Sequence, residues 1–129
     1  MSPAAAPDPG FVLGVGARSA VPDGELERAA EAAMGLAGVS VTVLATLDRR
    51  ADLVRPLADR RGWTLLAFTD AELAGMPTPN VVRLTGAPSV CEAAALRAAG
   101  PGATLILPKR TYPGVTVAIA AYDRSRGGR

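Results

Sequence analysis

Short apolar runs alternate along the 129-residue chain with longer stretches in which apolar residues recur at helical spacing. Short runs that are rich in β-branched residues and bounded by glycine or proline are typical of strands. Such runs occupy residues 11–15, 39–44, 63–68, 104–107 and 115–120, and a further candidate occupies residues 81–84.

The stretches between these runs have the periodicity of amphipathic helices. The predicted helices cover residues 22–37, 49–61, 70–73 and 89–99. Gly38 and Gly62 follow the first two, in the position where a glycine commonly ends a helix. Ser89 and Glu92 have the spacing of a capping box and mark the start of the last one. Strands that alternate with helices predict an α/β fold, a single three-layer α/β/α domain with a central, mostly parallel sheet of about five to six strands.

Both ends of the chain lack this pattern. Residues 1–10 are rich in proline and alanine, and residues 123–129 are rich in arginine and glycine. We therefore expect a disordered N-terminal segment, a domain at residues 11–122, and a disordered basic tail. The tail carries three arginines and one aspartate, so its net charge equals the +2 of the whole chain and the charges of residues 1–122 sum to zero. A nearly neutral domain in which only 4% of the residues are aromatic is not expected to bind nucleic acid.

The chain contains no histidine and a single cysteine, Cys91. The lack of histidine removes the usual general base near neutral pH and the commonest transition-metal ligand, and one cysteine excludes an internal disulfide. We therefore expect neither a metal site nor a bound cofactor. The first residues lack the pattern of a signal peptide, and no apolar run reaches the roughly 20 residues of a membrane span. These features predict a cytoplasmic protein that is not associated with a membrane.

The segment 103–121 contains the most informative pattern in the chain. Its two apolar runs are separated by a charged, turn-rich stretch, residues 108–114, that contains the only lysine, Lys109, followed by Arg110. The sequence predicts two strands joined by a loop, with both cationic side chains at the end of the first strand. That edge of an α/β sheet commonly holds an anionic ligand, although an ordinary solvated turn is the alternative.

Other polar residues follow predicted strands or begin predicted helices in the same way. The carboxyl ends of parallel strands meet at one edge of a sheet, so we expect these residues to gather around a ligand with several carboxylates or phosphates. The predicted binding residues are Gly16, Arg18, Thr46, Asp48, Ser89, Glu92, Lys109 and Arg110.

Two of these residues have competing interpretations. Asp48 is the candidate proton acceptor if the protein is a catalyst, and otherwise it caps the second helix. Ser89 either places the backbone N–H groups of a helix N-terminus beside an anion or simply caps that helix. No pair of residues resembles a nucleophile with its base.

The glycines in Gly14-Val15-Gly16 resemble the start of a dinucleotide fingerprint. The third glycine is replaced by Ser19, so a tight turn after the first strand is favoured over a nucleotide site.

Several stretches resemble, in their order and spacing, the CobE family, which is also the C-terminal domain of CbiG. These proteins belong to cobalamin (vitamin B12) biosynthesis. The resemblance covers about residues 11–121. The stretches that carry it are residues 12–18, 45–48, 74–80, 86–96, 107–110 and 114–120. Residues 17–20 depart from the pattern, because the family often has Cys-Arg-Arg/Lys-Gly after the first glycines and this chain has Ala-Arg-Ser-Ala.

The resemblance implies a compact α/β domain that takes part in processing the corrin macrocycle. Precorrins carry a rim of acetate and propionate groups and are therefore polyanions. The predicted function is the binding or processing of a polycarboxylated precorrin or corrin intermediate. Arg18, Lys109 and Arg110 would pair with its carboxylates, and Thr46 and Asp48 would line the pocket.

Two alternatives follow from the same resemblance. CbiG-like proteins hydrolyse a ring-A δ-lactone in cobalt-precorrin-5A and release acetaldehyde, so this chain would be a lactone hydrolase. The chain looks like the standalone CobE-like form, without the N-terminal part of CbiG-like proteins. A non-catalytic carrier or partner of other cobalamin-pathway enzymes, such as its methyltransferases, is therefore the second alternative.

Overall fold

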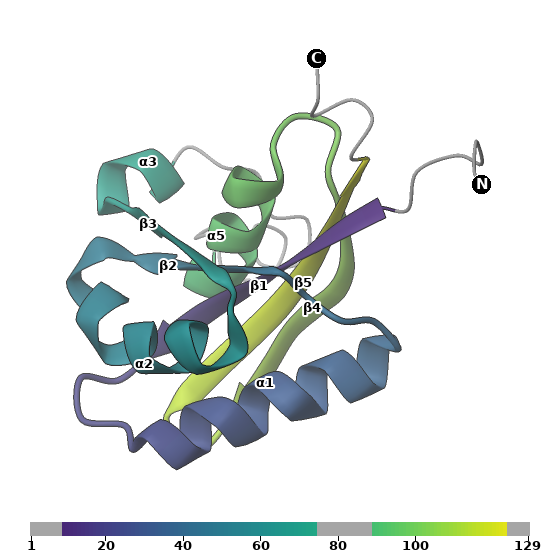
Figure 1. Cartoon of the computed structure of the whole chain (residues 1–129). Coiled ribbons are helices and arrows are strands. Elements are labelled where there is room, and N and C mark those ends of the chain that lie inside the picture. The colour runs from purple at the N-terminus through teal and green to yellow at the C-terminus, as the bar shows by residue number, and fades with distance from the viewer. Residues whose placement is uncertain (1–8, 75–88, 124–129) are drawn as a thin grey trace.

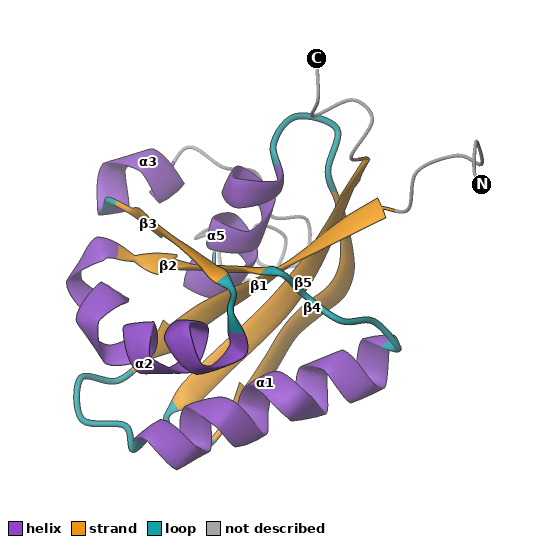
Figure 2. Cartoon of the chain, in the orientation of Figure 1, coloured by secondary structure: helices purple, strands orange, loops and turns teal. Residues whose placement is uncertain are grey.

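The computed structural model describes residues 9–74 and 89–123. Five strands form one sheet in the order β3-β2-β1-β5-β4 (Figures 1 and 2). Their bounds are β1 Pro9–Ala17, β2 Val43–Leu47, β3 Thr64–Phe68, β4 Thr104–Tyr112 and β5 Val115–Asp123. β1 pairs in parallel with β2, and β2 with β3, whereas β5 runs antiparallel to both of its neighbours, β1 and β4. Only β5 therefore opposes the other strands, which confirms the mostly parallel sheet.

Helices cover both faces of the sheet and complete the predicted three-layer α/β/α domain (Figure 1). α1 (Asp23–Ala37) and α2 (Ala51–Arg61) form one outer layer, and the short 3₁₀ helix η1 (Asp48–Arg50) leads directly into α2. α5 (Val90–Ala99) packs on the opposite face of β1, β5 and β2, with α3 (Asp70–Ala74) beside it.

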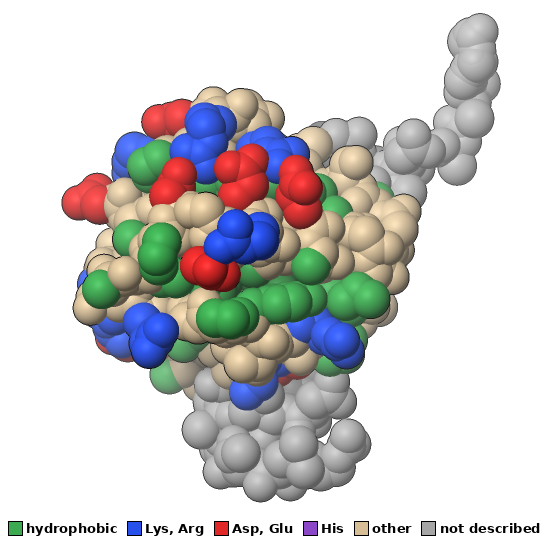
Figure 3. All heavy atoms as spheres, turned by 90° about the horizontal axis from the view of Figure 1, so that it is seen from below, with side chains coloured by type: hydrophobic (Ala, Val, Ile, Leu, Met, Phe, Trp, Pro, Cys, Tyr) green, Lys and Arg blue, Asp and Glu red, His purple; other side chains and the backbone are tan. Residues whose placement is uncertain are grey.

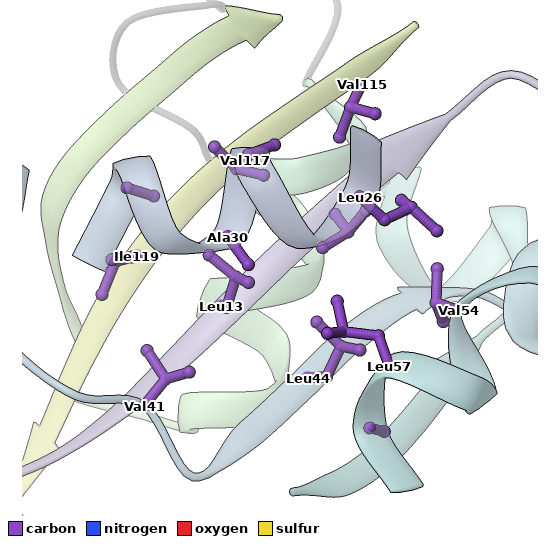
Figure 4. Close-up of a cluster of buried hydrophobic side chains, with 14 of the residues drawn as sticks. Leu13, Leu26, Ala30, Val41, Leu44, Val54, Leu57, Val115, Val117 and Ile119 are labelled. Carbon is purple, nitrogen blue, oxygen red and sulfur yellow. The ribbon is translucent and has the colours of Figure 1, made fainter. Parts of the chain in front are cut away.

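Two hydrophobic cores result from the alternation of side chains along each strand. Leu13 and Val15 of β1 point toward the α1–α2 layer, where they pack with leucines and valines of α1, β2, α2 and β5 (Figure 4). Val12 points to the other face, where the core is built largely from Ala93, Ala94 and Ala95 of α5. The small side chains on that face let α5 lie close to the sheet.

Glycines in β1 bring α5 still closer. A Cβ atom on Gly14 would lie 1.9 Å from the carbonyl oxygen of Cys91 and 2.9 Å from Cβ of Ala95. A Cβ on Gly16 would lie 2.8 Å from Oγ1 of Thr116. The interpretation of these glycines as a turn was wrong, because β1 continues through both of them to its last residue. Gly14 allows α5 to approach β1 closely, and Gly16 leaves room for the side chain of Thr116 on the neighbouring strand β5.

Two strand boundaries also differ from the sequence-based prediction. β2 begins at Val43 rather than at residue 39, and Val41 instead inserts into the core from the preceding connection. β4 extends through most of the predicted loop, so Lys109 and Arg110 lie within this strand and not at its end. The turn itself is only Pro113-Gly114, with Gly114 at φ 73°, where glycine is favoured.

The position of β4 at the edge of the sheet explains why Pro108 does not end it. Edge strands tolerate proline and irregular pairing because one side of their backbone has no strand partner. The register of β4 against β5 shifts twice, between Leu105 and Leu107 and again between Leu107 and Arg110. The predicted strand at residues 81–84 lies outside the described residues.

Candidate functional site

An open pocket of about 510 Å³ lies where β1 ends and the β4–β5 hairpin turns. Its walls are residues 16–18 from β1 and the following loop, Arg50 from η1, and residues 111–112 and 114–116 from the hairpin. We call it the arginine pocket. Parallel α/β sheets commonly bind ligands at this edge, outside the carboxyl ends of their strands.

Two arginines of the arginine pocket are held in different ways. Arg50 is half-buried, and its Nε donates a hydrogen bond of 2.7 Å to the carbonyl oxygen of Ala17. Arg18 is exposed, and its backbone N–H donates to the carbonyl oxygen of Gly114 at 3.1 Å. The guanidinium of Arg18 lies against this turn, because a Cβ atom on Gly114 would be 3.1 Å from Nη2 of Arg18.

Neither pocket arginine forms an ion pair with a carboxylate among the described residues. The arginines between α1 and α2 behave differently, because Arg60 pairs with Asp23 and Glu27, and Arg61 pairs with Glu27 and Glu31. Positive charge that acidic side chains do not neutralise is available to an anionic ligand. The arginine pocket therefore has the charge and the position expected of an anion-binding site.

The start of α5 lies beside this pocket at Gly16, because a Cβ atom on Gly16 would be 3.7 Å from Cβ of Val90. Thr116, which lines the pocket, donates a hydrogen bond of 3.4 Å to the carbonyl oxygen of Gly16. Oγ of Ser89 accepts a hydrogen bond from the backbone N–H of Glu92 at 3.2 Å and lies 3.2 Å from Sγ of Cys91. The predicted cap by Ser89 is thus confirmed.

Cys91 is not suited to act as a nucleophile. Burial raises the pKa of its thiol above the ordinary range, and this outweighs the hydrogen bonds from Ser89 and Thr116 that act in the opposite direction. A protonated, fully buried thiol reacts slowly. Its contribution is to pack α5 against β1.

Glu92 is the only acidic residue among the described positions that is completely buried. Its Oε2 accepts a hydrogen bond of 3.0 Å from the backbone N–H of Lys109, and its Oε1 has no partner among the described residues. The predicted capping box is therefore only half formed, because this carboxylate bonds to β4 and does not return to the backbone of Ser89. The irregular pairing of β4 brings the N–H of Lys109 within reach.

The structure separates the other predicted site residues. Thr46 is completely buried and donates a hydrogen bond of 2.8 Å to the carbonyl oxygen of Val15, so it joins β2 to β1. Asp48 is exposed at the start of η1. Neither lines the arginine pocket. Lys109 and Arg110 are exposed on β4, immediately before the two β4 residues that do line it.

Of the predicted residues, the arginine pocket therefore contains Gly16 and Arg18, with Ser89 and Glu92 at the adjoining start of α5. Sequence reasoning missed Arg50. The only signal in the sequence was the pair Arg49-Arg50 shortly after a predicted strand. In the structure the two side chains have different partners, because Arg49 binds Asp70 at 2.5 Å while Arg50 bonds to Ala17 and lines the pocket.

Within residues 9–74 and 89–123, no three histidine, cysteine or acidic side chains are grouped as a metal site would require. The same part of the chain contains no helix that is long and apolar enough to cross a membrane.

This chain resembles known proteins of cobalamin biosynthesis. The family model described as cobalamin synthesis G C-terminus matches residues 11–120. The cobalamin biosynthesis protein chiG from Agrobacterium tumefaciens shares 30% sequence identity, with a TM-score of 0.68 over 85% of this chain and 96% of that one. CobE, a protein from the cobalamin biosynthetic pathway, shares 28% identity, with a TM-score of 0.73 over 90% of this chain and 92% of that one. No protein with a curated description matches the chain.

A cobalamin biosynthesis protein G homolog from Sulfolobus solfataricus has the same fold, with a TM-score of 0.76 and 20% identity over 88% of this chain. This chain spans 37% of the length of that protein.

Proposed function

Because the chain belongs to the family of the cobalamin synthesis G C-terminus, in the cobalamin biosynthetic pathway, we propose that it binds a polycarboxylated precorrin or corrin intermediate at the arginine pocket. The sequence resemblance to CobE and to the C-terminal part of CbiG is confirmed by the family match and by the similar structures.

One observation carries this proposal. Arg18 and Arg50 line the same open pocket, and no carboxylate among the described residues neutralises either of them. A corrin precursor has acidic side chains around the rim of a flat macrocycle, so two neighbouring carboxylates could each accept charge-assisted hydrogen bonds from one guanidinium. The pocket is open, so the rim would enter it while the rest of the macrocycle remains outside.

Lys109 and Arg110 would add longer-range attraction. Both are exposed on the strand that leads to the pocket, where their charges raise the local concentration of a polyanion. Ser89 and Glu92 would act through the start of α5, which adjoins the pocket at Gly16 and Thr116.

The described residues favour binding over covalent catalysis. The thiol of Cys91 is buried and protonated, and Asp48, the candidate base for a lactone hydrolase, does not line the pocket. A carrier that hands an intermediate to pathway enzymes is therefore better supported than a hydrolase. Release of acetaldehyde from a lactone-bearing precorrin by the purified chain, lost in Asp48→Asn, would reverse that preference.

The experiment is a titration of the purified protein with hydrogenobyrinic acid, followed by absorbance at low and high salt. We expect binding that weakens at high salt, because exposed charges are screened. The double variant Arg18→Ala/Arg50→Ala should bind at least a hundredfold more weakly, since each charged hydrogen-bonding group contributes roughly 1.5–3 kcal/mol.

Arg55→Ala is the matched control, because Arg55 is an exposed arginine of α2 that does not line the pocket. Its affinity should equal that of the wild type, and the melting temperatures of all three proteins should be similar. Equal affinity of the double variant and the control would contradict the proposed function.

A further inference from the structure

We propose that Arg50 is the residue that makes the arginine pocket select a carboxylate over an amide, with Arg18 contributing charge but little selectivity. This assignment rests on the proposed function and specifies how that site recognises its ligand.

The first argument is the way in which Arg50 is held. Its Nε is occupied by the carbonyl oxygen of Ala17 at 2.7 Å, at the end of β1, where Ala17 is paired with Val115 of β5. One hydrogen bond at Nε restrains the plane of the guanidinium and leaves both Nη groups for other partners. No described residue accepts a hydrogen bond from either Nη group of Arg50. The side chain therefore presents an oriented pair of donors to the pocket that it lines.

The second argument is the geometry of the ligand group. The two oxygens of a carboxylate match two parallel N–H donors, whereas an amide has one oxygen and an NH₂ group that itself donates. An amide opposite Arg50 would accept one hydrogen bond fewer and would have no ionic attraction to the guanidinium. Its NH₂ group would also face an N–H group of Arg50, and neither can accept a hydrogen bond from the other. An oriented fork should therefore discriminate strongly between an acid and its amide.

The third argument is the contrast with Arg18. This side chain is exposed and makes no hydrogen bond through its guanidinium within the described residues. An exposed, hydrated cation that no hydrogen bond orients attracts any negative charge, and salt screens that attraction. The two arginines of one pocket are thus expected to have separable functions.

The experiment compares Arg50→Lys with Arg18→Lys, because both substitutions keep the charge and remove the fork. Arg55→Lys, outside the pocket, is the matched control. Each protein is titrated with hydrogenobyrinic acid and with the same compound after its side-chain carboxylates have been converted to amides. The readout is the dissociation constant of the amide divided by that of the acid. A purely structural role of Arg50 would leave this ratio unchanged.

We expect Arg50→Lys to lower this ratio about tenfold, because it weakens the binding of the acid more than the binding of the amide. Arg18→Lys should change the ratio less than threefold, and Arg55→Lys should leave it at the wild-type value. An unchanged ratio in Arg50→Lys, with tight binding of the acid by the wild type, would overturn this assignment alone. Failure of the wild type to bind the acid would overturn the proposed function and this assignment together.

Discussion

The interface between α1 and α2 and the region around the end of β1 and the start of α5 differ in how their charged groups are paired. Between α1 and α2, Arg60 and Arg61 each contact two acidic side chains, and Figure 3 shows acidic and basic side chains next to one another on the face that includes α1. Around the end of β1 and the start of α5, Arg18 and Arg50 have no acidic partner among the described residues. Oε1 of Glu92 has no hydrogen-bond partner among them either.

This difference separates groups that support the fold from groups that are free to bind. Surface charges that are paired with one another stabilise a protein modestly and are not available to a ligand. Unpaired polar groups cost stability, and a protein retains them at functional sites. Substitutions in the two regions should therefore differ in the size of their effect, and the three predictions below run from the largest expected effect to the smallest.

The largest effect is expected where α5 approaches the sheet. Gly14→Ala places a methyl group 1.9 Å from a backbone oxygen of α5, so the helix must move. We expect a loss of about 3 kcal/mol or more in the free energy of unfolding, measured by urea denaturation.

Gly35→Ala is the matched control in α1, where an added Cβ atom would meet nothing within 4 Å. This change should be neutral or stabilise the protein by about 0.5–1 kcal/mol, because alanine favours a helix more than glycine does. Equal losses in the two variants would show that the two layers do not differ in closeness of packing.

An intermediate effect is expected at the buried carboxylate. Glu92→Ala removes the acceptor for the N–H of Lys109 and leaves a cavity, so we expect a loss of about 2–4 kcal/mol. Glu92→Gln keeps an acceptor oxygen and nearly the same side-chain shape, and should cost less than about 1 kcal/mol. If glutamine proved as damaging as alanine, the carboxyl group itself would be required, and Oε1 would have a partner in the folded protein.

The smallest effect is expected in the ion pairs between α1 and α2. Hydrogen bonds from Arg61 and Arg60 hold the pKa of Glu27 below its ordinary value. A lowered carboxyl pKa gives stability that is present above the ordinary value and is lost as pH falls through the lowered one. Glu27→Gln should therefore lower Tm slightly at pH 7 and low salt, and the difference should vanish in acid and at high salt.

Affinity for hydrogenobyrinic acid should not change in Glu27→Gln, since this residue does not line the arginine pocket. A loss of affinity as large as that of the pocket variants would contradict the division of the molecule into a paired region and a binding region.

The sequence by itself determined the fold class, because that depends on local patterns. Apolar runs with a period of two and helical stretches with a period of 3.6 establish which segments become strands and helices, and their alternation predicts the three layers. The glycine after each of the first two helices and the cap at Ser89 are equally local, and Gly38, Gly62 and Ser89 all cap helices in the structure. The stretches that resemble the CobE family were also sufficient to predict the family.

Only the tertiary structure decided which polar residues meet. Thr46 lies near the end of a strand, as the predicted site requires, but its hydroxyl donates a hydrogen bond to β1. Arg49 and Arg50 are adjacent in sequence and have different partners. Glu92 has the spacing of a capping box, yet it bonds to the shifted backbone of β4. Contacts of this kind depend on strand order, register and bulges, which arise from packing between segments far apart in the chain. For that physical reason the sequence did not reveal that Arg50 lines the arginine pocket.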